Sequence, residues 1–304
     1  MPVDRGDLEA AITSYWQIKE AQARRAREKK RAKAEAKKRA EAMLSGDITP
    51  AANGLDLARE VSVAESMSDG TQDTEIEEGD SGTEGSVRGG KQFDPIVDLV
   101  ANFFRDAGYP ESCIQTKSQL EVPGFYRPQK KWDVVVTWGK TLVAAFELKA
   151  LGGPSYGNNF NNRVEEAVGS ATDVRRAFSE SAPASSPWLG YFFLMEDDEG
   201  SRRPVRTAKS PLPVDGAWEG LSYQERGRVF SERLVSDSLY DTVCYVTVQK
   251  DIGEFQEPLS AVSWDAFSTA ITKRIEELRR AGVPETYVPS QTSWTEETIF
   301  DGLG

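Results

Sequence analysis

Two acidic residues and one lysine lie on neighbouring apolar segments in the middle of this chain. Asp133 comes directly before the apolar run 134–138, and Glu147, Leu148 and Lys149 close the next one. Carboxylates are the hard oxygen ligands that Mg²⁺ prefers, and the backbone carbonyl of Leu148 is a further candidate ligand. A Mg²⁺ held there stabilises charge on a phosphate and lowers the pKa of a bound water, which the Lys149 ammonium orients or helps to deprotonate. The spacing therefore predicts magnesium-dependent hydrolysis of a phosphodiester.

The period of a β-strand decides whether these side chains meet. Residues two apart project from the same face of a strand, so Glu147 and Lys149 point together. Asp133 joins that face if the turn takes three residues, 138–140, or if there is a bulge, for which Gly139 is suited because it tolerates a positive φ. A two-residue turn without a bulge places Asp133 on the opposite face. Patterns of this length also arise by chance in sheets, so the flanking sequence matters.

Three longer segments flank this pattern. They read GGKQFD at 89–94, YRPQKKWD at 126–133 and GGPSYGNNFNNRVEEAVGSA at 152–171. Together they resemble the XhoI family of type II restriction endonucleases from residue 89 to about residue 250, and a shorter similarity covers residues 15–22. The Asn-rich third segment is long and specific, unlike the catalytic triplet.

This resemblance implies a mixed α/β fold of the restriction-endonuclease type, called PD-(D/E)XK, with a central mixed sheet flanked by helices. It implies Asp133, Glu147 and Lys149 as the catalytic residues and Mg²⁺ as the cofactor. It also implies a homodimer that cuts both strands of a palindromic DNA duplex, typically CTCGAG, leaving a 5′ overhang, beside a paired DNA methyltransferase. Residues 26–88 depart from the family pattern as an insertion.

The composition excludes several other chemistries. The 304 residues include no histidine, which removes Ser-His-Asp hydrolysis, histidine-metal nuclease sites and Cys/His zinc sites. The two cysteines, Cys113 and Cys244, have apolar neighbours that predict buried free thiols. No apolar run approaches the roughly 20 residues that cross a membrane, and no signal peptide precedes residue 20. We therefore expect an enzyme of the bacterial cytoplasm without a membrane partner.

The net charge of −12 hides a strongly polarised chain. Residues 19–41 hold eleven basic and four acidic side chains, a net charge of +7, whereas residues 47–88 hold eleven acidic and two basic ones, a net charge of −9. Residues 10–45 contain neither Gly nor Pro, which predicts one long helix. Its basic part could lie along DNA phosphates, contact a partner subunit or contact nothing specific. The acidic stretch predicts a disordered linker, which could also fold back and screen the helix from DNA.

Apolar periodicity predicts the remaining elements of an α/β domain. We expect helices over 93–104, from a cap at Asn161 or Asn162 to about Phe178, and from a Ser263 cap to 278, with strands over 188–195 and 242–248. The expected divisions are a helical arm (1–45), an acidic linker (46–88), the nuclease domain (89–282) and a tail (283–304).

Polar residues near the expected site are candidates for further contacts. Asp94, in the first turn of the helix 93–104, is a candidate metal ligand, although an acid there also suits the helix dipole. Asn and Arg side chains can hydrogen-bond phosphates and the edges of adenine and guanine. The DNA-contact candidates are Asn158, Asn159, Asn161, Arg163, Arg127, Lys130, Arg202 and Arg203. Arg206 and Lys209, which lie with the last two in a basic segment before Pro211, are further candidates. Packing or solvated surface roles are the alternative for each.

Three functions fit these residues. A site-specific endonuclease is preferred because the catalytic pattern and the long Asn-rich segment occur together. A repair or recombination nuclease with little base preference would use the same residues, whereas a catalytically silent DNA-binding protein would not need all three charges. Defined fragments of plasmid DNA, smears, or uncut but shifted DNA distinguish the three in that order.

Overall fold

The structure is a computed structural model that describes residues 3–44, 90–181, 186–250 and 254–283. It separates into two compact units, one formed by residues 1–15 and 93–304 and the other by residues 16–92. The predicted acidic linker 46–88 and the tail from residue 284 onward lie outside the described residues. The first unit contains every candidate catalytic and DNA-contact residue.

A six-stranded sheet forms the centre of the first unit, in the order β1-β4-β5-β6-β7-β8. β5, β6 and β7 run parallel, β4 and β5 form an antiparallel hairpin, and the edge strands β1 and β8 are antiparallel to their neighbours. The strands are β1 (Ile114–Gln115), β4 (Val134–Trp138), β5 (Thr141–Leu151), β6 (Leu189–Glu196), β7 (Thr242–Val248) and β8 (Phe255–Gln256). The expected mixed sheet and its two buried strands are confirmed.

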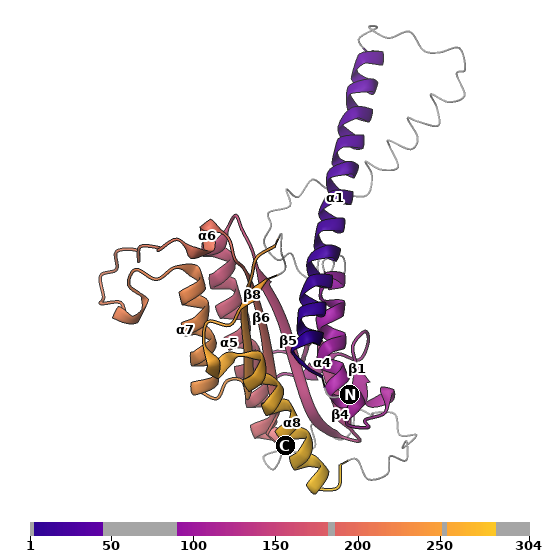
Figure 1. Cartoon of the computed structure of the whole chain (residues 1–304), viewed down its shortest axis with the longest axis vertical. Coiled ribbons are helices and arrows are strands. Elements are labelled where there is room, and N and C mark those ends of the chain that lie inside the picture. The colour runs from indigo at the N-terminus through magenta and orange to yellow at the C-terminus, as the bar shows by residue number, and fades with distance from the viewer. Residues whose placement is uncertain (1–2, 45–89, 182–185, 251–253, 284–304) are drawn as a thin grey trace, which may run out of the picture. The chain divides into compact units, whose positions relative to one another are not determined.

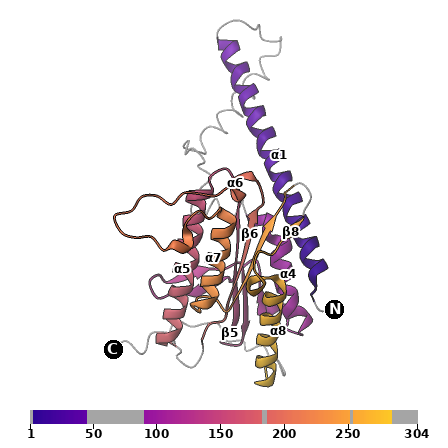
Figure 2. The same cartoon turned by 60° about the vertical axis from the view of Figure 1, so that its left-hand side comes forward.

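Helices cover both faces of this sheet (Figures 1 and 2). α5 (Tyr156–Ser181) and α7 (Tyr223–Ser236) lie on one face, and α4 (Asp94–Asp106) and α8 (Trp264–Arg280) lie on the other. Phe146 of β5 packs against rings of the second pair, with centroids 5.9 Å from Phe104 and 6.0 Å from Phe267. Because side chains alternate along a strand, the neighbouring Glu147 points to the α5 face.

Helix α5 begins earlier than predicted. It starts at Tyr156, so Asn161 and Asn162 lie inside the helix and do not cap it, and it continues to Ser181. A glycine in a helix costs about 1 kcal/mol, and this made the segment around Gly157 resemble a loop. Burial of Tyr156 and Phe160 against α7 outweighs that cost, because burying one aromatic side chain contributes roughly 2–3 kcal/mol.

Several elements of the first unit were not predicted, including the edge strands β1 and β8. A two-stranded hairpin pairs β2 (Glu121–Pro123) with β3 (Gln129–Lys131), and its short polar strands give no apolar alternation. α7 follows a capping box, in which Ser222 and Glu225 bond each other's backbone N–H. That Ser-x-x-Glu signal is readable in the sequence. Shorter helical segments are α6 (Glu199–Arg202) and the 3₁₀ turns Gly90–Phe93, Glu111–Cys113, Gly216–Trp218 and Ser260–Val262.

The predicted long N-terminal helix is present as α1 (Arg5–Leu44). Its first turns belong to the first unit, where Leu8 and Ile12 are fully buried and Arg5 forms an ion pair of 2.5 Å with Glu257. From residue 16 onward the helix belongs to the second unit, and residues 23–38 of this basic part are exposed. Among the described helices, none has the length and apolar character that a membrane span requires.

Candidate active site

The hairpin between β4 and β5 does not have the three-residue turn that was one of the two predicted alternatives. Trp138 pairs with Thr141, which leaves two residues, Gly139 and Lys140, in the turn. Gly139 has a φ of +58°, a left-handed conformation that glycine adopts without strain. By itself, this turn would put Asp133 on the wrong face of the sheet.

A β-bulge restores the required register. The pairing shifts between Val136 and Thr137 because Val143 of β5 is skipped. One extra residue on β5 moves every later residue by one place, so Asp133 lies opposite Glu147 at the end of the ladder. The predicted bulge is therefore present, but it is formed by Val143 and not by the glycine of the turn.

Asp133 is tied to the backbone of the strand that carries the other candidates. Its Oδ2 accepts a hydrogen bond of 2.8 Å from the backbone N–H of Leu148, and its own N–H donates to the carbonyl of Phe146 at 3.0 Å. Burial and the nearby Glu147 carboxylate raise the pKa of Asp133. The N–H and C=O of one strand residue point to the same side, so the Leu148 carbonyl also faces Asp133.

Glu147 is buried between two lysines. Its side chain is 3% exposed, with Lys130 Nζ 2.7 Å from Oε2 and Lys149 Nζ 3.1 Å from Oε1. Burial alone would raise the pKa of Glu147, but the two ammonium groups outweigh burial and hold that pKa below its ordinary value. The Lys130 ammonium also lies 4.5 Å from the centre of the Trp132 ring. Glu147 therefore stays ionised in a place where an unpaired carboxylate would be costly.

Lys149 is linked through a second carboxylate to helix α5. Its Nζ lies 3.7 Å from Oε2 of Glu166, which in turn lies 2.9 Å from Arg163. Burial would lower the pKa of Lys149, but the carboxylates of Glu147, Asp133 and Glu166 raise it. Lys149 therefore lies between a carboxylate of β5 and a carboxylate of α5.

Tyr191 lies directly beside Glu147 on the neighbouring strand β6. Its side chain is fully buried, and its hydroxyl has no hydrogen-bond partner among the described residues. Burial and then the Glu147 carboxylate raise its pKa well above the ordinary value. A buried polar atom of this kind is normally satisfied by water or an ion, so the cluster suits a polar occupant.

The donor set fits a hard divalent cation. The described residues contain no cluster of three or more His, Cys, Asp or Glu side chains that could hold a metal. Asp133, Glu147 and the Leu148 carbonyl provide a smaller oxygen set, and Mg²⁺ commonly uses one or two carboxylates while keeping several waters. Softer metals that depend on thiolate or imidazole have no suitable ligands in this set.

The remaining candidates differ in their exposure and in their partners. Asp94 is exposed in the first turn of α4, and among the described residues it has no hydrogen bond or ion pair with the cluster. Asn158 and Asn161 are exposed on the first turns of α5, where they are accessible to a ligand, and Asn159 is half-buried. Arg163 is 15% exposed and directed to Glu166.

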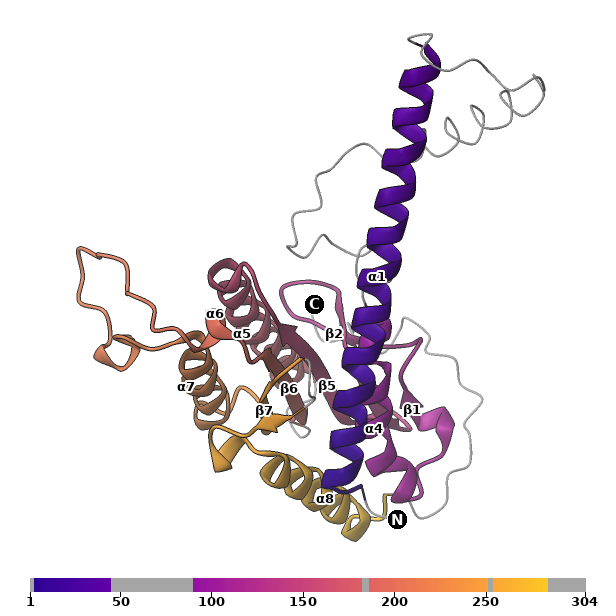
Figure 3. The ribbon, with the colours of Figure 1, turned by 45° about the horizontal axis from the view of Figure 1, so that its top comes forward.

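The basic candidates divide into paired and exposed side chains. Lys130 is 11% exposed and is a partner of Glu147. Arg127 donates to Asp173 at 2.7 Å, and Arg202 donates to Asp197 at 2.6 Å. Arg203, Arg206 and Lys209 are exposed on the segment between α6 and α7, which projects away from the sheet (Figure 3).

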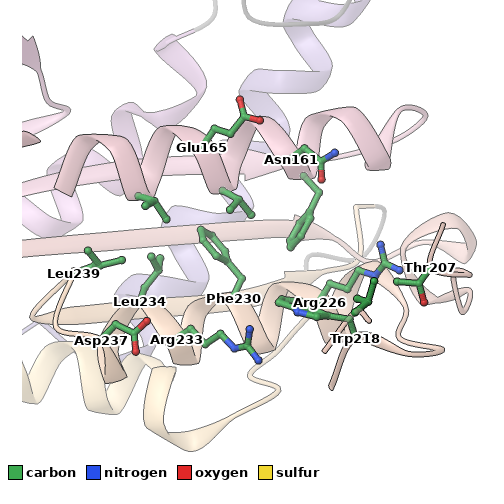
Figure 4. Close-up of a pocket in the computed structure, with 14 residues that line it drawn as sticks. Asn161, Glu165, Thr207, Trp218, Arg226, Phe230, Arg233, Leu234, Asp237 and Leu239 are labelled. Atoms are coloured by element: carbon green, nitrogen blue, oxygen red, sulfur yellow. The ribbon is translucent and has the colours of Figure 1, made fainter. Parts of the chain in front are cut away.

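A groove of about 470 Å³ lies between α5 and α7, apart from the carboxylate cluster. Phe230 and Leu234 of α7 point toward α5 in it, and Arg226 and Arg233 are among its lining residues (Figure 4). Asp133, Glu147 and Lys149 do not line it. The groove is therefore separate from the candidate active site.

Similar proteins define the class to which this fold and site belong. Three curated relatives are all type II restriction enzymes, which are site-specific deoxyribonucleases, and this chain is an enzyme of that class. It belongs to the restriction endonuclease XhoI family, whose model matches residues 72–257, more than half of the chain. No solved structure matches this chain.

Each of the three relatives matches part of this chain. Type II restriction enzyme BstVI of Geobacillus stearothermophilus is 39% identical over 181 residues, 57% of this chain and 81% of that protein. Type II restriction enzyme XhoI of Xanthomonas vasicola is 41% identical over 163 residues, 52% of this chain and 66% of that protein. Type II restriction enzyme AbrI of Azospirillum brasilense is 42% identical over 122 residues, 39% of this chain and 55% of that protein.

Proposed function

We propose that this chain is a Mg²⁺-dependent restriction endonuclease of the PD-(D/E)XK type that hydrolyses one phosphodiester bond in each strand of duplex DNA. The observation that carries the proposal is the register of the β4–β5 hairpin, which places Asp133 opposite Glu147 and beside Lys149. Family membership supports CTCGAG as the target, cut after the first C to leave a 5′ overhang.

Asp133, Glu147 and the Leu148 carbonyl are the groups that would hold the metal. When bound, Mg²⁺ supplies a Lewis acid for the phosphate and lowers the pKa of a coordinated water. The Leu148 N–H fixes the orientation of the Asp133 carboxylate, since it donates to Oδ2 at 2.8 Å. Lys130 neutralises Glu147, which stabilises the buried carboxylate when no metal is present.

Lys149 would orient the attacking water and stabilise negative charge that develops on the phosphate. Glu147 and Glu166 hold its ammonium from two sides, at 3.1 and 3.7 Å, and Arg163 holds Glu166. The side chain remains 24% exposed, so its charge is accessible to a substrate. Glu166 is thus a positioning residue for Lys149 in this proposal.

A palindromic target requires two catalytic faces related by a twofold axis, one for each strand. We therefore propose a homodimer that acts on DNA in the bacterial cytoplasm, alongside a methyltransferase that protects the same sequence in the host. Asn158, Asn161 and Arg203 are among the exposed candidates for contacts with the duplex.

A plasmid digestion tests the proposal. A plasmid with one CTCGAG is incubated with the protein in Mg²⁺ or in EDTA, beside a plasmid that lacks the site. We expect one linear product, formed in Mg²⁺ from the first plasmid alone. Lys149→Ala should lower the cleavage rate by at least about a hundredfold, since it removes an electrostatic group at the reacting phosphate.

Lys140→Ala is the matched control, because Lys140 is an exposed lysine in the turn of the same hairpin. It should cut at the wild-type rate. Cutting at a different fixed sequence would keep the catalytic assignment and replace the target. Absence of Mg²⁺-dependent cutting of any DNA by the wild-type protein would overturn the proposal.

A further inference from the structure

Two adjacent aromatic side chains project from the β2–β3 hairpin. Phe125 is 47% exposed and Tyr126 is 73% exposed, and their rings meet edge to face with centroids 5.0 Å apart. Most large apolar side chains of the described residues are buried, so neighbouring exposed rings are unusual in this structure. We call residues 124–127 the aromatic tip.

A buried carboxylate of α5 holds the aromatic tip in place. Oδ1 of Asp173 accepts hydrogen bonds from the backbone N–H groups of Phe125 and Tyr126 at 2.7 and 2.8 Å. Its Oδ2 accepts one from Nε of Arg127 at 2.7 Å, and the side chain is 4% exposed. Bonds to an ionised acceptor are stronger than neutral ones, so the backbone is fixed while both rings face outward.

Gly124 shows how closely the aromatic tip is built around this carboxylate. A Cβ at this position would lie 2.6 Å from Oδ2 of Asp173 and 2.7 Å from the carbonyl oxygen of Arg127. Both neighbours are fixed, one by its hydrogen bonds and one by the backbone. A rigid support for two exposed rings is what a surface that contacts a partner needs, since little entropy is then lost on binding.

The surroundings of the aromatic tip favour an anionic partner. The Arg176 guanidinium lies 5.1 Å from the centre of the Phe125 ring, forms an ion pair with Glu180 and is half exposed. Arg127, the partner of Asp173, is 46% exposed, and Lys131, at the end of β3, is exposed as well. Exposed cationic groups around exposed aromatic rings suit nucleic acid, whose bases and sugars pack on rings and whose phosphates attract the cations.

The aromatic tip is also close to the proposed reaction centre along the chain. β3 joins it to Lys130, whose ammonium contacts Glu147. Four steps of the chain lead from Tyr126 to Lys130, a span of at most about 13 Å even if every step were extended at roughly 3.3 Å per residue. One DNA strand advances about 3.4 Å per nucleotide, so the tip lies within about four base pairs of Lys130.

We propose that the aromatic tip packs against duplex DNA beside the scissile phosphate, with Phe125 and Tyr126 acting as an apolar wedge that unstacks a base step. This inference rests on the proposed function. Apolar wedges of this kind kink a duplex and hold it in one register. The tip would therefore position the phosphate and contribute to the choice of site, whereas Asp133, Glu147 and Lys149 carry out hydrolysis.

The test uses the full chain and a short synthetic duplex that contains CTCGAG, with 2-aminopurine in place of the adenine of the site. Binding is followed in EDTA by fluorescence anisotropy, and unstacking by the 2-aminopurine emission. Replacing both rings, Phe125→Ala with Tyr126→Ala, should weaken binding by about tenfold or more, since each stacked ring contributes roughly 1–3 kcal/mol. The emission increase on binding should be lost.

Val168→Ala is the control, because Val168 is an exposed apolar residue on α5 away from the aromatic tip, and it should bind like the wild type. If the double variant binds and unstacks DNA like the wild type while the wild type cuts the plasmid, the wedge is overturned and the nuclease stands. If the wild type does not cut the plasmid, but the double variant loses DNA affinity and the rise in 2-aminopurine emission, the proposed wedge is supported and the proposed nuclease activity is not. A change of oligomeric state in sedimentation, without DNA, would assign the rings to a subunit interface and overturn the proposal.

Discussion

At the scale of single residues, Glu147 has two cationic neighbours that compete with the proposed metal. The shared face of Glu147 and Lys149 was predictable because the period of a strand fixes it, whereas the place of Asp133 depended on the bulge at Val143. Lys130, Glu166 and Tyr191 were not assigned to the cluster, since their place in it depends on the packing of a separate hairpin, helix and strand on β5.

Removal of Lys130 should strengthen metal binding. Lys130→Ala leaves Glu147 with one ammonium partner, so a divalent cation competes with one ion pair fewer. We expect the dissociation constant for Mg²⁺ without DNA, measured by calorimetry, to fall about three- to tenfold, which corresponds to roughly 1 kcal/mol. Lys131→Ala, at the exposed neighbouring position, should leave it unchanged. Weaker Mg²⁺ binding by Lys130→Ala would show that Lys130 supports the metal site.

The contribution of Asp173 to stability should depend on pH. Burial opposes ionisation of Asp173, but hydrogen bonds from Tyr126, Arg127 and Phe125 outweigh burial and lower its pKa. A lowered folded-state pKa gives stability that is fully present above the unfolded value of about 3.9 and is lost as the pH falls through the folded value. Asp173→Asn should therefore unfold about 2 kcal/mol more easily at pH 7.

Urea unfolding of the wild type and of Asp173→Asn, followed by tryptophan fluorescence, measures this difference at each pH. We expect the difference to shrink as the pH is lowered below about 4, because the wild-type carboxylate then loses its charge. Asp237→Asn changes an exposed aspartate and serves as the control. A difference for Asp173→Asn that is constant with pH would contradict the assignment.

At the scale of elements, apolar runs determined what could be predicted. β5, β6, β7 and α8 are buried, and their periodicity gave their type and approximate bounds. The β2–β3 hairpin could not be predicted, because it is fixed mainly by the buried Asp173 of another element. The position of the bulge was also unpredictable, since Val143 is an ordinary strand residue whose neighbours share its apolar character.

Close packing between β5 and β6 leads to a prediction about Gly190. A Cβ there would lie 2.3 and 2.5 Å from ring atoms of Phe146, which the rings of Phe104 and Phe267 hold in place. Gly190→Ala should therefore lower the free energy of unfolding in urea by about 1–3 kcal/mol. Gly169→Ala is the control, since that exposed helical glycine has open space around it and alanine favours a helix by roughly 0.5–1 kcal/mol.

A double variant identifies the cause of this loss. Phe146→Leu narrows the side chain that the new methyl group meets, so Gly190→Ala should cost less in that background than in the wild type. Equal losses in both backgrounds would show that the clash with Phe146 is not the cause.

At the scale of the whole molecule, the proposed hydrolysis does not explain why basic side chains gather in residues 19–41 and acidic ones in residues 47–88. The basic part of α1 is helical with exposed side chains, as its lack of Gly and Pro predicted, and Arg31 and Glu35 pair along it at 2.9 Å. The acidic residues 47–88 lie outside the described residues. The basic helix is therefore the part whose role in DNA binding can be tested directly.

Neutralising this helix should reduce the salt dependence of DNA binding. Each phosphate contact contributes about 0.9 to the slope of log K against log salt concentration. Changing three exposed lysines of α1 to alanine should lower the slope, measured on nonspecific duplex, by about 1 to 3. These lysines are Lys29, Lys30 and Lys33, and the control of equal charge change replaces the exposed Lys117, Lys140 and Lys273. An unchanged slope for the first variant would mean that α1 contributes no phosphate contacts.

Helix α5 connects the two parts of the site that the proposals assign to different tasks. Glu166 contacts Lys149, the proposed catalytic lysine, and Asp173 holds the aromatic tip, and a helical separation of seven residues places them about 10.5 Å apart. That length equals roughly three base pairs. In this proposal α5 fixes the distance between the scissile phosphodiester bond and the base step that the aromatic tip contacts. One residue inserted between them would turn Asp173 by about 100° relative to Glu166, away from the aromatic tip, and should weaken DNA binding while the contact between Glu166 and Lys149 remains.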